Sequence, residues 1–115
     1  MRKALTTLYL FLFILIIGCS NNNEFEELNA KEFNTVVVSL NGSQIYKSNN
    51  NDVIEGIVNE ININRKEFAT EMSFSNEPEG KIKFTGENEV KVSFFEDTGR
   101  SIYGNYYIHT EFKFD

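Results

Sequence analysis

The second half of the chain alternates between hydrophobic and polar residues, which is the period of β-strands with one buried face. From Phe68 onward most of the large apolar residues occupy even-numbered positions, whereas the odd-numbered positions are mostly Glu, Ser, Lys, Thr and Asn. Turn-forming residues at 77–80, 86–88 and 97–99 divide this stretch into four strands. The pattern predicts a four-stranded antiparallel β-meander whose even-numbered side chains, among them Phe84 and Phe94, form a core.

The lengths of two tight loops set the pairing of these strands. Three-residue loops at 86–88 and 97–99 place Phe84 opposite Val90 and Phe94 opposite Ile102. A loop of even length would move apolar residues to opposite faces, because a shift of one residue exchanges the faces of a strand. We therefore expect both loops to contain three residues.

Two elements are expected before the meander. Apolar residues alternate on both sides of Asn41-Gly42 and predict a hairpin over 34–48, in which a type I′ turn pairs Leu40 with Ser43 and Val38 with Ile45. Residues 52–62 show a helical stripe, and Asp52 is expected to cap the first turn. The stripe consists of Ile54, Ile57, Val58 and Ile61. The predicted fold is therefore α+β, a single small domain over 33–115 with an N-terminal β-hairpin, one amphipathic helix and a four-stranded antiparallel β-meander.

The first 19 residues have the features of an export signal. Two basic residues, Arg2 and Lys3, precede a run without charge over 4–17. This run suits the apolar region of a secretory signal, about 7–15 residues, and is short for a membrane-spanning helix of about 18. Ile16-Ile17-Gly18-Cys19 resembles the lipobox of bacterial lipoproteins, with Ile where Leu is commoner. The resemblance implies a signal peptide over 1–18 and a lipid on Cys19; the alternatives are an ordinary signal peptide with an incidental Cys, or an uncleaved anchor.

Residues 19–32 are expected to form an acylated Cys followed by a flexible tether, since the segment is polar and acidic without a sustained period. Several acyl chains on one Cys bind a membrane durably. The domain would then be lipid-anchored at the cell membrane or outer membrane, facing the periplasm or the cell exterior. The sequence does not separate these membranes.

Composition argues against several kinds of site. The 115 residues include 11 basic and 17 acidic ones; Arg2 and Lys3 lie in the expected signal peptide, so the rest of the chain carries a charge of −8. Such a chain is a poor candidate for binding nucleic acid, which needs clustered Lys and Arg. A single Cys excludes a disulfide framework and any metal site built from several Cys residues. No cofactor is expected.

Groups for catalysis are scarce. His109 is the only imidazole and has the parity of the polar face. Cys19 is expected to be acylated, which removes it as a nucleophile. The chain has no Gly-x-Ser-x-Gly elbow. We therefore expect a protein that is not an enzyme, and a small hydrolase is the least favoured interpretation.

Aromatic residues interrupt the otherwise polar odd-numbered face. Phe95, Tyr103 and Tyr107 share this parity, and in the expected register they form one patch with His109 at its end. Grouped, exposed aromatics are typical of contact surfaces. The chain is thus predicted to be a non-catalytic binding module whose partner is a basic protein or peptide, because its negative charge attracts cations. The alternative is that the hairpin or the tether buries these rings in a second small core, which would favour a structural or assembly accessory of the envelope.

Overall fold

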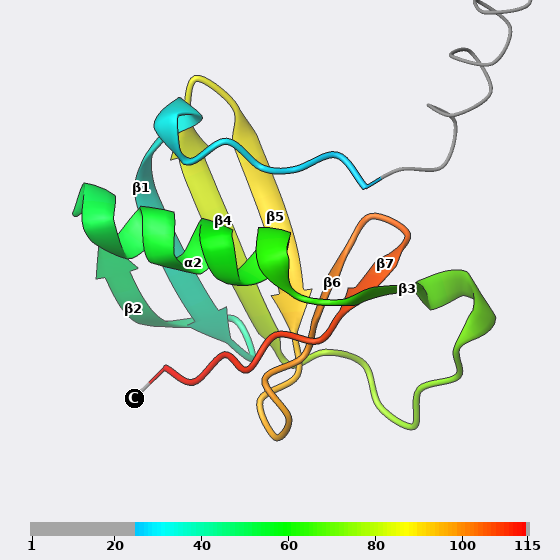
Figure 1. The fold of residues 1–115 in the computed structure, drawn as a ribbon. Helices are drawn as coiled ribbons and strands as arrows, with labels where there is room; N and C mark the ends of the chain where they lie inside the picture. The colour runs from blue at the N-terminus through cyan, green and yellow to red at the C-terminus, as the bar shows by residue number, and fades with distance from the viewer. Residues whose placement is uncertain (1–24, 115) are drawn as a thin grey trace, which may run out of the picture.

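The computed structural model describes residues 25–114, and within that range it contains one α-helix and one antiparallel sheet of seven strands. The α+β class is therefore confirmed. The predicted signal peptide and Cys19 lie outside the described residues. In chain order the elements are η1 (Ala30–Glu32), β1 (Phe33–Leu40), β2 (Ser43–Ser48), α2 (Asn51–Ile63), β3 (Lys66–Phe68), η2 (Ala69–Glu71), β4 (Gly80–Gly86), β5 (Glu89–Phe94), β6 (Ser101–Tyr103) and β7 (Tyr106–Ile108). The strand order in the sheet is β2-β1-β4-β5-β6-β7-β3 (Figure 1).

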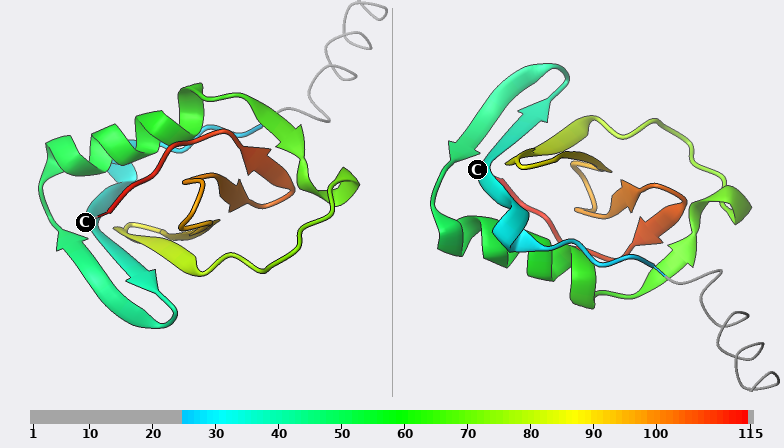
Figure 2. Two further views of the ribbon diagram at one scale, coloured as in Figure 1. Left: turned by 90° about the horizontal axis from the view of Figure 1, so that it is seen from below. Right: turned by 90° about the horizontal axis from the view of Figure 1, so that it is seen from above.

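Helix α2 connects the two edge strands of the sheet, β2 and β3. Viewed along the strands, the sheet curls around the core, and α2 lies along the side between those edges (Figure 2). The predicted apolar stripe of the helix is confirmed as buried against the sheet. The predicted cap is wrong: the helix begins earlier, and the Asn50 side chain accepts the N–H of Asp52 at 2.9 Å. Asp52 instead lies in the first turn, where its negative charge interacts favourably with the positive end of the helix dipole.

The hairpin of β1 and β2 forms around the predicted turn, in which Asn41 and Gly42 both have positive φ angles. Leu40 pairs with Ser43 as predicted, but Val38 pairs with Tyr46 rather than Ile45. A bulge between Val38 and Ser39 shifts the register by one residue. Ile45 consequently remains 44% exposed.

The four-stranded meander is not observed in the predicted form. Residues 72–79 are a loop rather than a strand, and the position beside β4 belongs to β1. This non-local pairing brings Val36 opposite Phe84 and Val38 opposite Ile82, and all four side chains are fully buried. The pairing of β4 with β5 does follow the prediction, since Phe84 lies opposite Val90 across the loop at 86–88.

The register after β5 differs from the prediction. Phe94 pairs with Ser101 and Ser93 with Ile102, so six residues rather than seven separate the pair that contains Phe94. The expected strand after Gly99 is also divided into β6 and β7 by a two-residue turn at 104–105. Ser101 therefore faces the core, and Ile102 shares the outer face with Tyr107, its partner on β7. The one-residue shift exchanged the faces of β6.

The described part of the expected tether, 25–32, packs on the domain. Phe25 and Leu28 contact the hydrophobic core. The Asn62 side chain on α2 holds the backbone of Leu28 at two points: its Oδ1 accepts the Leu28 N–H at 2.9 Å, and its Nδ2 donates to the Leu28 carbonyl at 2.8 Å. The folded domain therefore includes residues 25–32, which were predicted to belong to the tether.

Candidate functional site

Three of the four predicted patch residues lie together on the outer face of the sheet. The ring centroids of Phe95 and Tyr107 are 6.4 Å apart, and Tyr107 meets His109 edge to face at 5.3 Å. The sequence did not single out Phe74, which lies in the 72–79 loop and packs on Phe95 at 5.4 Å and on Tyr107 at 5.6 Å. We call Phe74, Phe95, Tyr107 and His109 the aromatic cluster.

Tyr103 is not part of the aromatic cluster. In the observed register it pairs with Tyr106 and packs against the core side of the sheet. Its ring meets Phe25 edge to face at 6.1 Å. The predicted patch included Tyr103 because a three-residue loop was assumed at 97–99.

The loop between β5 and β6 fixes the position of Phe95. The Phe95 N–H donates to the Arg100 carbonyl, and the Gly99 N–H donates to the Phe95 carbonyl, both at 2.8 Å. Below the loop, the buried Thr110 hydroxyl donates to the Gly99 carbonyl at 2.7 Å. The Ser101 hydroxyl lies 2.8 Å from the Thr110 hydroxyl and donates to it, since the Thr110 proton is already used. These bonds tie one wall of the aromatic cluster to the C-terminal segment.

The aromatic cluster borders a shallow cleft of about 220 Å³ between the 72–79 loop and the outer face of the sheet. Phe74, Phe95 and Tyr107 supply its aromatic walls, and Glu79 and Asp97 supply carboxylates. Phe74 is 38% exposed, while Phe95 and Tyr107 are half-buried. Carboxylates next to aromatic faces attract a cation, both by direct charge and through the ring quadrupoles. The cleft is therefore suited to a cationic side chain.

His109 ends the aromatic cluster and belongs to a charged group on the β3–β7 edge. Its Nε2 lies 2.5 Å from Glu67 Oε2 and 3.1 Å from Arg65 Nη2. One nitrogen cannot both donate to the carboxylate and accept from the guanidinium, and the shorter contact identifies Nε2–H as the donor to Glu67. This hydrogen bond, helped by the Arg65 charge, holds the pKa of Glu67 below its ordinary value.

A larger hollow of about 520 Å³ lies between the 28–33 segment and α2. Its lining is mixed, with side-chain amides of Asn29, Asn59 and Asn62 beside Leu28 and Phe33. Asn62 is already engaged by the Leu28 backbone. We therefore favour the smaller cleft, where aromatic and acidic groups converge, as the candidate binding site.

Among residues 25–114, no three His, Asp or Glu side chains are grouped so that they could hold a metal ion. Within that range no helix combines the length and the apolar character needed to cross a bilayer. No protein-family model, curated protein or solved structure matches this chain.

Proposed function

We propose that this protein is a lipid-anchored envelope protein that acts as a non-catalytic binding module, and that its cleft takes a cationic side chain of a basic protein or peptide. One observation carries the binding part of the proposal. The half-exposed rings of Phe74, Phe95 and Tyr107 surround a cleft that also contains Glu79 and Asp97. The anchoring part rests on the lipobox-like segment that ends at Cys19.

The burial of the rings favours a binding role over that of an accessory without a ligand. Rings that served only as a second core would be covered, whereas Phe74 is 38% exposed and its neighbours are half-buried. Partly exposed aromatics of this kind supply much of the binding energy at interfaces, and removing the best of them costs about 2 kcal/mol or more.

The contacts of His109 favour a non-catalytic role. In the described part of the chain the imidazole contacts Glu67, Arg65 and the Tyr107 ring, and it makes no hydrogen bond to a hydroxyl or thiol. A histidine that served as general base would need a nucleophile within hydrogen-bond reach. The arrangement instead supports a charged, hydrogen-bonded rim for the aromatic cluster.

The experiment measures binding of a lysine- and arginine-rich peptide to the full chain in neutral detergent. Phe95→Ala with Tyr107→Ala should weaken binding at least about 30-fold, which corresponds to about 2 kcal/mol. Glu79→Gln with Asp97→Asn leaves the rings in place and should weaken binding mainly at low salt. Ile63→Ala is the control, because Ile63 is 78% exposed and lies on α2.

The proposal fails if the peptide does not bind, or if its affinity changes neither with the two pairs of substitutions nor with the salt concentration. If the peptide binds as expected, a pulldown from the native envelope with the chain immobilised through Cys19 identifies the natural partner. That partner should lose its binding in the same variants.

A further inference from the structure

Four lysines project from the outer face of neighbouring strands. The ladder aligns Lys47 on β2, Val37 on β1, Lys83 on β4 and Lys91 on β5 in one row. Neighbouring strands are about 4.8 Å apart, so three lysines of this row lie within about 14 Å. Lys81 lies two residues, or about 7 Å, from Lys83 along β4. We call Lys47, Lys81, Lys83 and Lys91 the lysine face.

The charge of the lysine face opposes the charge of the rest of the chain. Lys83 and Lys91 lie directly opposite each other, which destabilises a sheet. Glu89 relieves part of this repulsion, with its Oε1 at 3.0 Å from Lys83 Nζ, and the ammonium in turn lowers the pKa of Glu89. The formal charges of the four lysines and Glu89 sum to +3, and the other residues from Cys19 onward carry a formal charge of −11. The fold thus concentrates positive charge where sheet stability does not call for it.

The residue types on this face indicate recognition by charge alone. Lysine acts as a point charge, without the planar bidentate geometry of arginine. Among the outward-facing residues of β1, β2, β4 and β5, none is aromatic, so the face offers no ring on which a nucleic-acid base could stack. A partner with dense, repeated negative charge fits this surface. The acidic remainder of the chain would repel such a partner and so confine it to the lysine face.

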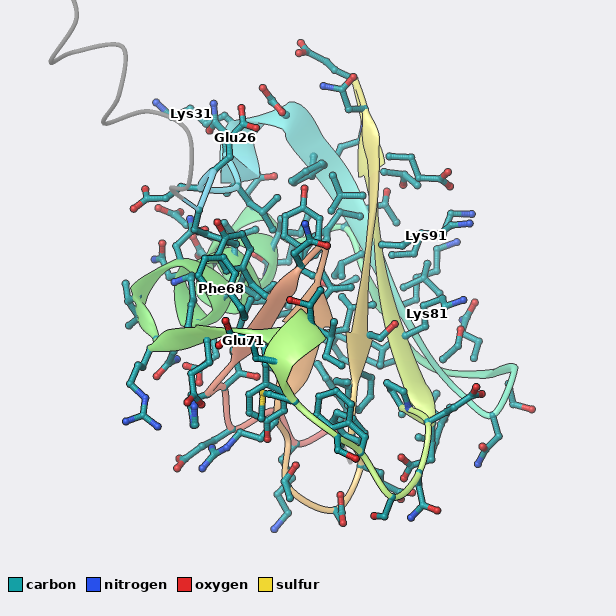
Figure 3. The ribbon with its side chains drawn as sticks, turned by 90° about the vertical axis from the view of Figure 1, so that its right-hand side faces the viewer. Glu26, Lys31, Phe68, Glu71, Lys81 and Lys91 are labelled. Atoms are coloured by element: carbon teal, nitrogen blue, oxygen red, sulfur yellow. The ribbon has the colours of Figure 1, made fainter. Side chains whose placement is uncertain are left out.

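The direction of the lysine face narrows the choice of partner. Lys81 and Lys91 project from the side of the domain opposite Glu26 and Lys31 (Figure 3). Cys19 precedes Phe25 by six residues, which span at most about 20 Å. If Cys19 carries the proposed lipid, so short a segment keeps the Glu26 side next to the membrane and turns the lysine face away. This step rests on the proposed function.

We propose that the lysine face binds a linear phosphate polymer that lies beyond the anchoring membrane. The rigid row of lysines meets successive phosphates of one chain, and no pocket is needed. This site is separate from the cleft that is proposed to take a cationic side chain.

The test measures binding of inorganic polyphosphate to the full chain in neutral detergent, at about 50 mM and about 200 mM salt. Lys81→Gln with Lys91→Gln should weaken binding about 25-fold, or about fivefold for each lysine removed near a charged partner. The same pair should make the slope of log affinity against log salt shallower by about 1.4, from about 0.7 for each contact to a single-stranded polyanion. Lys31→Gln with Lys113→Gln is the matched control, because it removes the same charge at exposed lysines outside this face.

Three results would overturn the proposal: no binding at the lower salt, equal weakening in the control pair, or an affinity that ignores Lys81 and Lys91. Two further probes identify a different occupant. Lysine-dependent binding to vesicles of anionic phosphatidylglycerol without binding to polyphosphate would assign the face to a lipid surface, and tighter binding of single-stranded DNA would assign it to nucleic acid. Failure of the basic peptide to bind the cleft would leave these measurements unchanged, so the two proposals fail separately.

Discussion

Two glycines with similar backbone angles make a sharp test of how the C-terminal segment supports the aromatic cluster. Gly99 has a φ of +76° and Gly104 a φ of +59°, a region that residues with a Cβ rarely adopt. Their surroundings differ. A Cβ on Gly104 would meet nothing within 4 Å, whereas a Cβ on Gly99 would lie 2.5 Å from the Phe112 nitrogen and 2.6 Å from its oxygen. The pair Gly99→Ala and Gly104→Ala thus separates backbone strain from steric displacement.

The expected magnitudes follow from these contacts. At Gly104 the left-handed conformation costs about 1–2 kcal/mol, partly offset by the lower entropy of the unfolded alanine chain, for a net loss of about 1 kcal/mol. At Gly99 the same loss applies, and Phe112 must also move. That movement disturbs two hydrogen bonds to the Gly99 carbonyl, from the Phe112 N–H at 3.0 Å and from the Thr110 hydroxyl at 2.7 Å. At about 1 kcal/mol each, Gly99→Ala should destabilise the domain by about 3 kcal/mol.

Urea unfolding followed by far-ultraviolet circular dichroism measures both variants against the parent chain. The slope m should stay constant, so that the shift in midpoint reports stability. Gly99→Ala should also weaken basic-peptide binding, because the Gly99 N–H donates to the Phe95 carbonyl and so fixes a wall of the cleft. If the two variants lose equal stability, within about 0.5 kcal/mol, the packing of the C-terminal segment beneath the loop is not as described.

Four other predictions follow from the same structure. Gly56→Ala, in the interior of α2 with nothing within 4 Å of the new Cβ, should stabilise the domain by about 0.5–1 kcal/mol in the urea assay. Phe84→Ala and Phe94→Ala should each cost about 3–5 kcal/mol, because both rings are buried; losses below about 0.5 kcal/mol at both would contradict the core. Mass spectrometry of membrane-extracted protein should find an acylated peptide that begins at Cys19, and an intact N-terminus at residue 1 in the membrane-bound pool would refute the anchor. Glu67→Gln should be less stable than the parent chain at pH values above 4.5, the ordinary carboxyl pKa. This difference in stability should disappear as the pH falls through the lowered pKa of Glu67. A difference that does not change with pH would exclude the pairing of Glu67 with His109.

The local elements were predictable because neighbouring residues determine them. The helical stripe of α2 needs only the spacing of its apolar residues, and it is buried as expected. The loop at 86–88 connects consecutive strands, and its length alone sets Phe84 opposite Val90. The order of the sheet is a different kind of property, since β1 reaches β4 across a helix and a long loop. The alternation of apolar and polar residues within a strand carries no information about which other strand pairs with β4.

The error at β6 has an identifiable physical source. The prediction assumed a loop of three residues, 97–99, between β5 and β6. In the structure the Phe95 N–H donates to the Arg100 carbonyl and Phe94 pairs with Ser101, so the loop has four residues, 96–99, and the register shifts by one. The Gly104-Asn105 dipeptide is a hairpin signal that could have corrected the prediction, because a two-residue turn there pairs Tyr103 with Tyr106. That pairing places Tyr103 and Tyr107 on opposite faces. The sequence gives no comparable signal at Phe74. Its even-numbered position fits the alternation of a β-strand, but in the structure it lies in the 72–79 loop.

Net charge does not show where the individual charges lie on the folded domain. A total of −8 predicts a basic partner and argues against nucleic acid, and the fold in addition gathers Lys47, Lys81, Lys83 and Lys91 on one outer face. The nearest charges of the two sites are those of Lys81 on β4 and of Glu79 in the cleft, which are two residues, or about 7 Å, apart. This separation is comparable with the Debye length of about 8 Å at physiological ionic strength, so salt weakens the coupling between the two sites without removing it. At low salt the screening weakens further, and a cation in the cleft should then strengthen the attraction between the lysine face and an anion.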